Sequence, residues 1–194
     1  MSKKTLILLY PGAIAFEIML AAEILHRTFP VEVATPNGQP LLNSNGMEIR
    51  AALSYPEVNI NSYACVLVPG GDPGSIMENE EIDRILQQAD AARLHIGGIC
   101  AGALVLAKTG ILRGRTITHN YTPRYAPPEV VSFTARYWEG MTVFDQPVVV
   151  DEHIITAMPY GSIDFAMALA VGLGIYSEEK AAKMGQYYRG SYPF

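Results

Sequence analysis

The sequence predicts one doubly wound α/β domain, with a mostly parallel sheet between helices, over residues 1–194. Two observations support this fold class. Short continuous apolar runs alternate with segments whose apolar residues recur every three or four positions, which is the pattern of buried strands followed by helices. No internal repeat, low-complexity tract or linker interrupts the alternation. A chain of 194 residues is also long enough to bury a sizeable core as one domain.

The expected elements follow from local patterns. Strands are predicted at residues 5–10, 31–35, 64–71, 95–99 and 116–119. Two Asn-Gly turn signals predict a small hairpin within residues 41–52, and the stretches 133–140 and 147–157 suggest a late antiparallel pair. Helices are predicted at residues 16–26, 78–94, 101–108, 162–173 and 177–188. The first helix is indicated by the spacing of Phe16, Met19, Leu20 and Ile24, and Ser177 is the expected N-cap of the last one.

Composition excludes several classes of protein. Hydrophobic residues make up 49% of the chain and charged residues 17%, as in a globular domain, and the formal net charge is −5. The acidic balance argues against nucleic acid and anionic membranes as partners. No apolar run reaches the ~18 residues of a membrane span, and the early run "LILLY" is short for a signal peptide. Two cysteines make neither a disulfide framework nor a metal site, so we expect a cytoplasmic protein without a metal. No G-x-G-x-x-G follows the first strand, and we expect no nicotinamide or other cofactor.

The stretch "GGICAGALVLAKTGIL", residues 97–112, places Cys100 where a strand should become a helix. A reactive residue on such a sharp turn between small neighbours forms a nucleophile elbow. The free N–H groups of the helix that starts at Ala101 point at the sulfur, and we expect them to favour the thiolate and to help hold an oxyanion. The other cysteine, Cys65, lies in the middle of an apolar strand, where a packing role is expected.

Three further positions are candidates for chemistry with Cys100. The loop "VPGGDPG" ends a neighbouring strand, and the N–H groups of Gly70 and Gly71 (or Asp72) could form an oxyanion hole, although the loop could also be a plain turn. Glu17 follows the first strand and could transfer a proton, or could serve only as an acid in a first helical turn. His119 ends a strand near the same edge, either as a pocket residue or as a structural hydrogen-bonding group.

Four stretches together resemble the ThiJ/PfpI superfamily: "LILLYPGAIAFEIMLAAEIL", "CVLVPGGDPGSI", "GICAGALVLAKTGILRGRTITH" and "ITAMPYGSIDFAMALA". The resemblance implies a flavodoxin-like three-layer sandwich of the class I glutamine amidotransferase type. It also implies that Cys100 is the nucleophile, that Glu17 is a protonated acid held against the sulfur, and that Gly70 and Gly71 form the backbone-donor loop. His119 matches a histidine of the parkinsonism-associated deglycase branch, in which "ICAG" also occurs.

Departures from the family's patterns narrow the chemistry. Peptidase-like members have His after the cysteine, where this chain has Ala101, and amidotransferases need a late His-x-Glu that "MPYGSIDF" lacks. The isonitrile hydratase branch resembles this chain in overall sequence, including the ending "SYPF", but has Asp at the position of Glu17 and Thr at that of Ala101.

The resemblance therefore predicts a cofactor-independent cysteine enzyme of glyoxalase III or deglycase type that acts on small reactive carbonyls. Two alternatives stay open. One is isonitrile hydration by the same thiolate, and the other is a redox-sensing or ligand-binding module in which Cys100 is oxidised. The family also implies a homodimer with the site near the interface.

Overall fold

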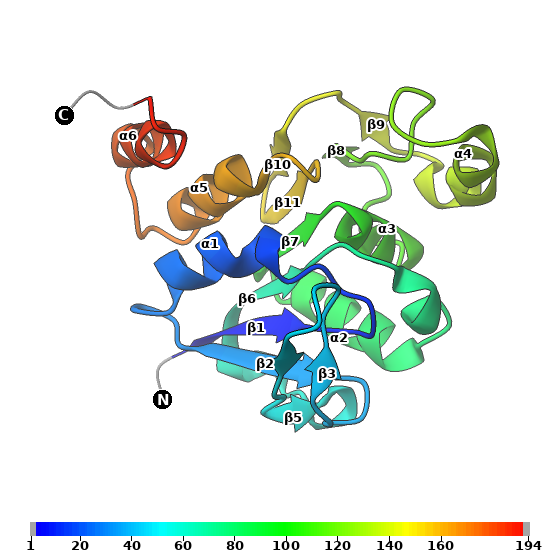
Figure 1. Ribbon diagram of the computed structural model, residues 1–194, viewed down its shortest axis with the longest axis horizontal. Helices are drawn as coiled ribbons and strands as arrows, with labels where there is room; N and C mark the ends of the chain where they lie inside the picture. Colours follow the sequence, from blue (N-terminus) through cyan, green and yellow to red (C-terminus); the bar gives the residue numbers. More distant parts are fainter. Residues whose placement is uncertain (1–2, 192–194) are drawn as a thin grey trace.

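The protein, seen in a computed structural model that describes residues 3–191, is built around a seven-stranded sheet (Figure 1). Six strands run parallel and the edge strand β10 runs antiparallel to its neighbour. Across the sheet the order is β10 (Val148–Asp151), β11 (Ile154–Ala157), β7 (His95–Ile99), β6 (Tyr63–Val68), β1 (Lys4–Leu8), β2 (Val31–Thr35) and β5 (Leu53–Ser54). The mostly parallel α/β sandwich predicted from the sequence is therefore confirmed.

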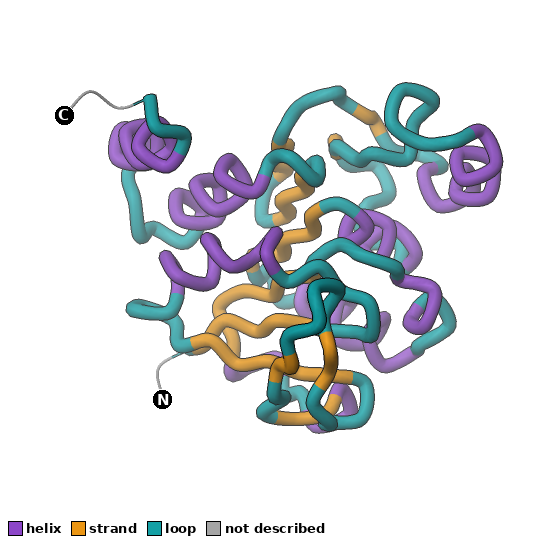
Figure 2. The backbone as a smooth tube through the Cα atoms, viewed as in Figure 1, coloured by secondary structure: helices purple, strands orange, loops and turns teal. Residues whose placement is uncertain are grey.

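Helices cover both faces of the sheet (Figure 2). They are α1 (Phe16–Leu25), α2 (Glu80–Ala91), α3 (Ala101–Lys108), α4 (Pro128–Thr134), α5 (Ser162–Gly172) and α6 (Glu178–Tyr188). Four 3₁₀ turns join them: η1 (Tyr55–Glu57), η2 (Ile60–Ser62), η3 (Pro73–Ile76) and η4 (Ala135–Trp138). Helices α5 and α3 lie on opposite faces of the sheet, because the adjacent glycines of β7 face different helices: Gly97 faces Phe165 of α5, and Gly98 faces Leu106 of α3. Helix α1 packs beside α5, and α6 packs outside α5.

Most predicted elements are present close to their predicted bounds, including the hairpin of β3 (Leu41–Leu42) with β4 (Glu48–Ile49). Strands β10 and β11 form the expected late antiparallel pair. Residues 133–140, however, are not extended as predicted: they finish α4 and form η4. The reason is Pro128, which occupies the start of α4 and presets the helical φ angle there.

The strand predicted at residues 116–119 shortens to β8 (Thr116–Ile117), which pairs with β9 (Thr142–Val143) outside the main sheet. At the next residue, Thr118, hydrogen bonds to and from side chains replace the backbone hydrogen bonds between strands. The Thr118 N–H donates to Thr156 Oγ1 at 2.9 Å, and the Thr118 hydroxyl donates to the Gln146 carbonyl at 2.9 Å. His119 consequently lies on a loop rather than on a strand.

Only part of the spacing that predicts α1 marks its buried face, since Ile24 is buried but Phe16 and Met19 are not. Phe16 and Met19 are 65% and 43% exposed, whereas Glu17, Ile18 and Ala21 are buried. The helix is thus rotated so that an acidic side chain, and not the neighbouring phenylalanine, points into the protein. This rotation places Glu17 in the site described below.

Glycines let α3 approach the sheet closely. Beneath α3, a Cβ on Gly102 would overlap the backbone carbonyl oxygen of Val68, the last residue of β6. Because β6 and β7 are central strands buried on both faces, this approach is part of the core. It also positions the start of α3 next to the loop that follows β6.

We expect Gly102→Ala to destabilise the protein by about 1–3 kcal/mol, because the new methyl group meets rigid backbone in a packed core. Gly185→Ala is the matched control in α6, where a Cβ meets the flexible tip of Arg189 at 3.0 Å and Met167 Cγ at an ordinary contact distance of 3.6 Å. The control should be neutral or stabilising by up to about 1 kcal/mol, as helix propensity favours alanine. Urea unfolding of both variants measures the difference, and equal stability of the two would contradict this packing.

Candidate active site

Cys100 occupies the turn between β7 and α3 with a strained backbone. Its φ of 56° and ψ of −126° lie outside the regions that L-residues normally adopt, and such strain costs about 1–3 kcal/mol. The Cys100 N–H donates to the Ala157 carbonyl of β11 at 2.9 Å, and its own carbonyl accepts from the Ala103 N–H at 3.1 Å. These bonds hold the turn, and the half-buried sulfur lies at the carboxyl edge of the sheet. The predicted elbow geometry is therefore present.

Glu17 approaches the sulfur from the first turn of α1. The residue is 2% exposed, its Oε2 accepts a hydrogen bond from the Gly70 N–H at 2.8 Å, and its carboxyl group hydrogen-bonds to Cys100. Only glycine fits at position 70, since a Cβ there would lie 2.5 Å from both Cys100 Cβ and Glu17 Oε2. The structure thus brings the two principal predicted residues together.

The backbone donors differ in part from the expected set. The Gly70 N–H, expected as an oxyanion donor, donates to Glu17 Oε2 in this structure. The N–H groups of Gly71 and Ala101 hydrogen-bond to the sulfur of Cys100. Gly71 has a φ of 120° and a Cβ there would overlap the Gly12 carbonyl oxygen, so this position also requires glycine.

Burial changes the protonation of the pair. It raises the pKa of the Cys100 thiol to about 12, with a further increase from the neighbouring Glu17, against the opposing effect of the Ala101 and Gly71 N–H groups. Burial likewise raises the pKa of Glu17, although the Gly70 N–H opposes it. The N–H group at the start of α3 favours the thiolate, as predicted, but desolvation outweighs this effect, so the pKa of the thiol is raised overall and not lowered. The coupled pair retains a proton, and moving it from sulfur to Glu17 creates a thiolate beside a neutral carboxyl group.

His119 is held by an aromatic contact near this edge. Its ring stacks on Trp138 with centroids 3.8 Å apart and planes 8° from parallel, and Nδ1 accepts from the Tyr121 N–H at 3.0 Å. Burial lowers the pKa of His119 to about 4, so the neutral ring carries its proton on Nε2. Among residues 3–191, no hydrogen bond joins His119 to Cys100 or Glu17.

Comparison with known proteins identifies the family of this chain. Residues 3–171 match the model of the DJ-1/PfpI family. The chain belongs to the DJ-1/PfpI family. Protein dj-1beta of Drosophila melanogaster is 32% identical over 175 residues, which cover 88% of this chain and 89% of that protein. The crystal structure of Drosophila DJ-1beta superposes with a TM-score of 0.78 at 27% identity, covering 100% of both chains.

Two enzymes are more distant relatives of this DJ-1/PfpI chain. A protein of Caenorhabditis elegans named glutathione-independent glyoxalase DJR-1.2 is 28% identical over 172 residues, covering 86% of this chain and 87% of that protein. The isonitrile hydratase of Pseudomonas putida is 27% identical over 158 residues, covering 80% of this chain and 64% of the hydratase. The family thus includes enzymes of both chemistries considered from the sequence.

Two tyrosines near Cys100 escaped the sequence analysis. The buried Tyr10 donates its hydroxyl proton to the Pro69 carbonyl at 2.8 Å. Burial raises the pKa of both Tyr10 and Tyr121, and the charge of a Cys100 thiolate adds to the increase. Tyr10 ends an apolar run and carries no signal that separates it from a core aromatic residue. Tyr121 lies two positions after His119, in a loop rich in proline. Its closeness in sequence to a predicted site residue was the signal that could have identified it as a neighbour of Cys100.

Cys65 plays the packing role expected from its mid-strand position. It is fully buried in β6, and its sulfur donates to Thr5 Oγ1 at 3.4 Å. Within residues 3–191 no cluster of three or more His, Cys, Asp or Glu side chains is arranged to hold a metal ion. In the same range no helix is long and apolar enough to cross a membrane.

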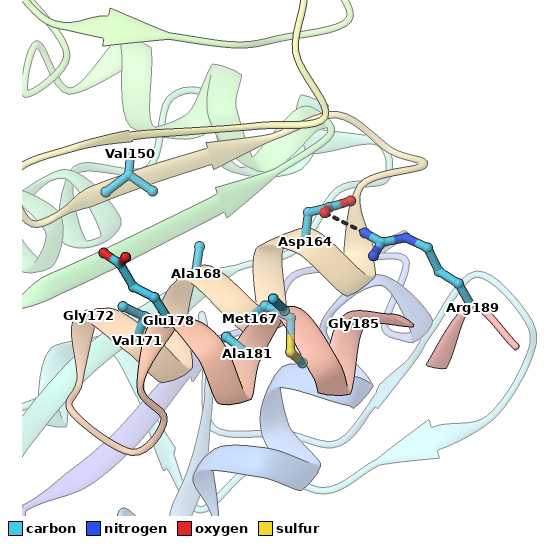
Figure 3. Close-up of a pocket in the computed structure, with 11 residues that line it drawn as sticks. Val150, Asp164, Met167, Ala168, Val171, Gly172, Glu178, Ala181, Gly185 and Arg189 are labelled. Atoms are coloured by element: carbon cyan, nitrogen blue, oxygen red, sulfur yellow. Dashed lines mark hydrogen bonds and ion pairs between the residues drawn. The ribbon is translucent and has the colours of Figure 1, made fainter. Parts of the chain in front are cut away.

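A separate groove of about 450 Å³ lies between α5, α6 and the edge strand β10 (Figure 3). Mostly small and apolar side chains line it, among them Val150 and Met167, and an ion pair joins Asp164 to Arg189 at one end. None of the site residues predicted from the sequence lines this groove.

Cys100 should react with iodoacetamide at least about 10-fold faster than Cys65, because its sulfur is partly accessible whereas Cys65 is fully buried. The rate at Cys100 should rise steeply from pH 7 to pH 9, since its pKa of about 12 leaves little thiolate at neutrality. Mass spectrometry of peptides from the native protein measures both rates, with Cys100→Ser as control. Equal labelling of the two cysteines, or a rate that is flat above pH 7, would contradict this assignment.

Proposed function

We propose that the protein is a cofactor-independent enzyme that converts small 2-oxoaldehydes, such as methylglyoxal, to 2-hydroxy acids. The observation that supports this most directly is the buried pair of Glu17 with Cys100, which shares a proton next to the N–H groups of Gly71 and Ala101. An isomerisation between two adjacent carbons needs a nucleophile to hold the substrate and one group that both accepts and donates protons. The similarity to a glutathione-independent glyoxalase agrees with this proposal.

The reaction balances with these groups and water alone. Cys100 passes its proton to Glu17, the thiolate attacks the aldehyde carbon, and the oxyanion accepts hydrogen bonds from the Gly71 and Ala101 N–H groups. Glu17 then protonates that oxygen, which gives a hemithioacetal. The Glu17 carboxylate removes the proton from the former aldehyde carbon and delivers it to the ketone oxygen, which gives an enediol. It then takes the hydroxyl proton of the former aldehyde carbon and delivers it to the adjacent carbon, which leaves a thioester carbonyl and a hydroxyl group. The resulting thioester is hydrolysed by water to lactate and free Cys100.

His119 enters the proposal as a neutral hydrogen-bonding group. With Nδ1 accepting from Tyr121, the Nε2–H is the donor that remains, and stacking on Trp138 fixes the plane of the ring. A neutral donor can orient a substrate oxygen without adding a charge to the site. Its low pKa excludes a role as a general acid in the imidazolium form at neutral pH.

Isonitrile hydration is the second enzymatic candidate, and the side chains here favour it less. Ala101 has no hydroxyl group to offer, where the hydratase branch has Thr, and Glu17 is one methylene longer than Asp. A site built on polar contacts loses orders of magnitude in rate when one partner is missing or displaced. The relative identities do not separate the two chemistries, since both enzymes are 27–28% identical to this chain.

We expect the wild-type protein to form lactate from methylglyoxal without glutathione, and little or no formamide from cyclohexyl isocyanide. Cys100→Ala should abolish the activity. Glu17→Gln keeps a similar shape but cannot exchange protons, and should lower the rate by about 10²–10⁴-fold. Glu23→Gln, on the exposed side of the same helix, is the matched control and should retain full activity.

Both assays should be run on one preparation. Robust formamide production without lactate would reverse the ranking of the two reactions. Absence of both products, with ready oxidation of Cys100 by peroxide, would instead support the redox-sensing alternative.

We further propose that the protein forms a homodimer through exposed apolar side chains of α1 and the β3–β4 hairpin. Phe16 and Met19 on α1, and Leu42 and Met47 at the hairpin, are 43–65% exposed. The Ser44 N–H donates to the Ala13 carbonyl at 3.0 Å, which ties the hairpin to the turn before α1. The resulting apolar surface borders the turn that leads to Glu17, so a second copy would cover the rim of the site.

Analytical ultracentrifugation should give twice the 21.2 kDa of one chain. Met19→Glu should shift the equilibrium to monomer, because a charge in an apolar contact is poorly solvated. The exposed Phe144, on the loop after β9, offers a control as Phe144→Glu and should leave the mass unchanged. A wild-type monomer at micromolar concentration would rule the dimer out.

A further inference from the structure

A small hollow lies at the far end of α3, away from the Cys100 end of that helix. Its volume is about 240 Å³, and its border includes Lys108, Arg113, Arg136, Tyr137 and Glu139. Lys108 ends α3, Arg113 follows in the next loop, and the other residues belong to η4 and the residue after it. The two loops are tied together, because the Gly114 N–H donates to the Gly140 carbonyl at 2.9 Å.

The arginines at this hollow lack the partners that most arginines of the chain have. Five of the nine arginines form ion pairs: Arg84, Arg93, Arg115, Arg124 and Arg189. Arg113 and Arg136 form none with any carboxylate of the described residues, although both border the same hollow. The positive charge of Lys108 is already matched by Asp83. Two guanidinium groups without a carboxylate partner among the described residues therefore border the hollow, together with one acidic side chain, Glu139, that pairs with neither.

Arg136 is also held in place before any ligand binds. Its Nη2 donates to the Tyr137 hydroxyl oxygen at 2.8 Å, and its guanidinium lies 4.8 Å from the Tyr137 ring centroid and 5.9 Å from that of Phe133. Because the Tyr137 oxygen accepts this bond, its own proton stays available for another acceptor. A fixed guanidinium loses less conformational entropy when it binds an anion.

We propose that this hollow binds a small tetrahedral oxyanion, either inorganic phosphate or the phosphate group of a small monoester. Planar guanidinium groups match the oxygens of phosphate with paired hydrogen bonds, and a double negative charge complements two arginines. A volume of about 240 Å³ is below the range of roughly 300–1,000 Å³ typical of drug-sized ligands, which limits the ligand to a small group. The chain has a net charge of −5, so the positive charge here is local.

The hollow is linked to the candidate active site through η4. Trp138 follows Tyr137 directly and stacks on His119 with ring centroids 3.8 Å apart. An anion bound by Arg136 and Tyr137 would therefore contact the segment that orients His119. Trp138 is also the only tryptophan of the chain, so its fluorescence reports on this segment alone.

The test is a titration of the full-length protein with inorganic phosphate at constant ionic strength, followed by Trp138 fluorescence and by isothermal titration calorimetry. Saturable binding is expected in the wild type. Arg113→Gln and Arg136→Gln should each weaken binding by about 10-fold or more, the loss typical of one charged hydrogen-bond donor. Glu139→Gln should tighten it, because the variant removes the only opposing charge. Arg50→Gln, an exposed arginine without a carboxylate partner among the described residues, is the matched control and should bind as the wild type does.

A second titration with a three-carbon phosphate monoester identifies the source of the phosphate group. Tighter binding of the ester assigns the site to an ester, and equal or weaker binding assigns it to the free ion; both support the site. No saturable signal up to about 10 mM phosphate, the limit of weak specific binding, would overturn the proposal. Binding that neither Arg113→Gln nor Arg136→Gln alters would overturn it as well, since the anion would then lie elsewhere.

Discussion

The contact among Glu17, Gly70 and Cys100 is the constraint on which the candidate site depends. Three segments distant in the sequence meet there: the first turn of α1, the loop after β6 and the turn after β7. Gly70 makes the meeting possible in two ways, since its N–H binds Glu17 and its missing Cβ leaves space for both side chains. Any larger residue would separate the acid from the sulfur. The close approach of α3 at Gly102 has the same purpose, because it sets the start of that helix beside the loop that contains Gly70.

The same contact determines the protonation states of Cys100 and Glu17, and burial affects the thiol pKa more than the backbone N–H groups do. A helix N-terminus and two N–H groups favour a thiolate, yet desolvation and the adjacent carboxyl group raise the thiol pKa. In the proposed reaction, these backbone donors would therefore contribute when negative charge develops on the substrate oxygen, and less in the resting state. This is how an oxyanion site contributes most, because donors that are already oriented need no reorganisation.

The sequence was sufficient to predict the parallel sheet and the elbow at Cys100, because each depends on a local motif. The contact of Glu17 with Cys100 was implied only by the resemblance to the ThiJ/PfpI superfamily, because the sequence by itself also allowed Glu17 to be a plain acid of a first helical turn. The sequence was insufficient for properties that depend on packing. The use of the Gly70 N–H by Glu17 and the raised pKa of Cys100 both require knowledge of what is buried. The stacking of His119 on Trp138 was missed because residues 133–140 were interpreted as extended, although Pro127 at the N-cap and Pro128 at the first position of α4 were a helix-start signal.

The raised pKa of Cys100 also bears on the choice between catalysis and redox sensing. A cysteine is oxidised more readily when it is a thiolate and when it is exposed. In the resting protein the Cys100 sulfur is mostly protonated, and the residue is only partly exposed. A sensor needs a thiolate at all times, whereas an enzyme needs one only while substrate is bound. In the proposed reaction, Glu17 is the proton acceptor within hydrogen-bonding contact, so the nucleophile would form only when a carbonyl substrate is in place. The arrangement therefore favours turnover of an electrophilic substrate over permanent readiness for oxidation.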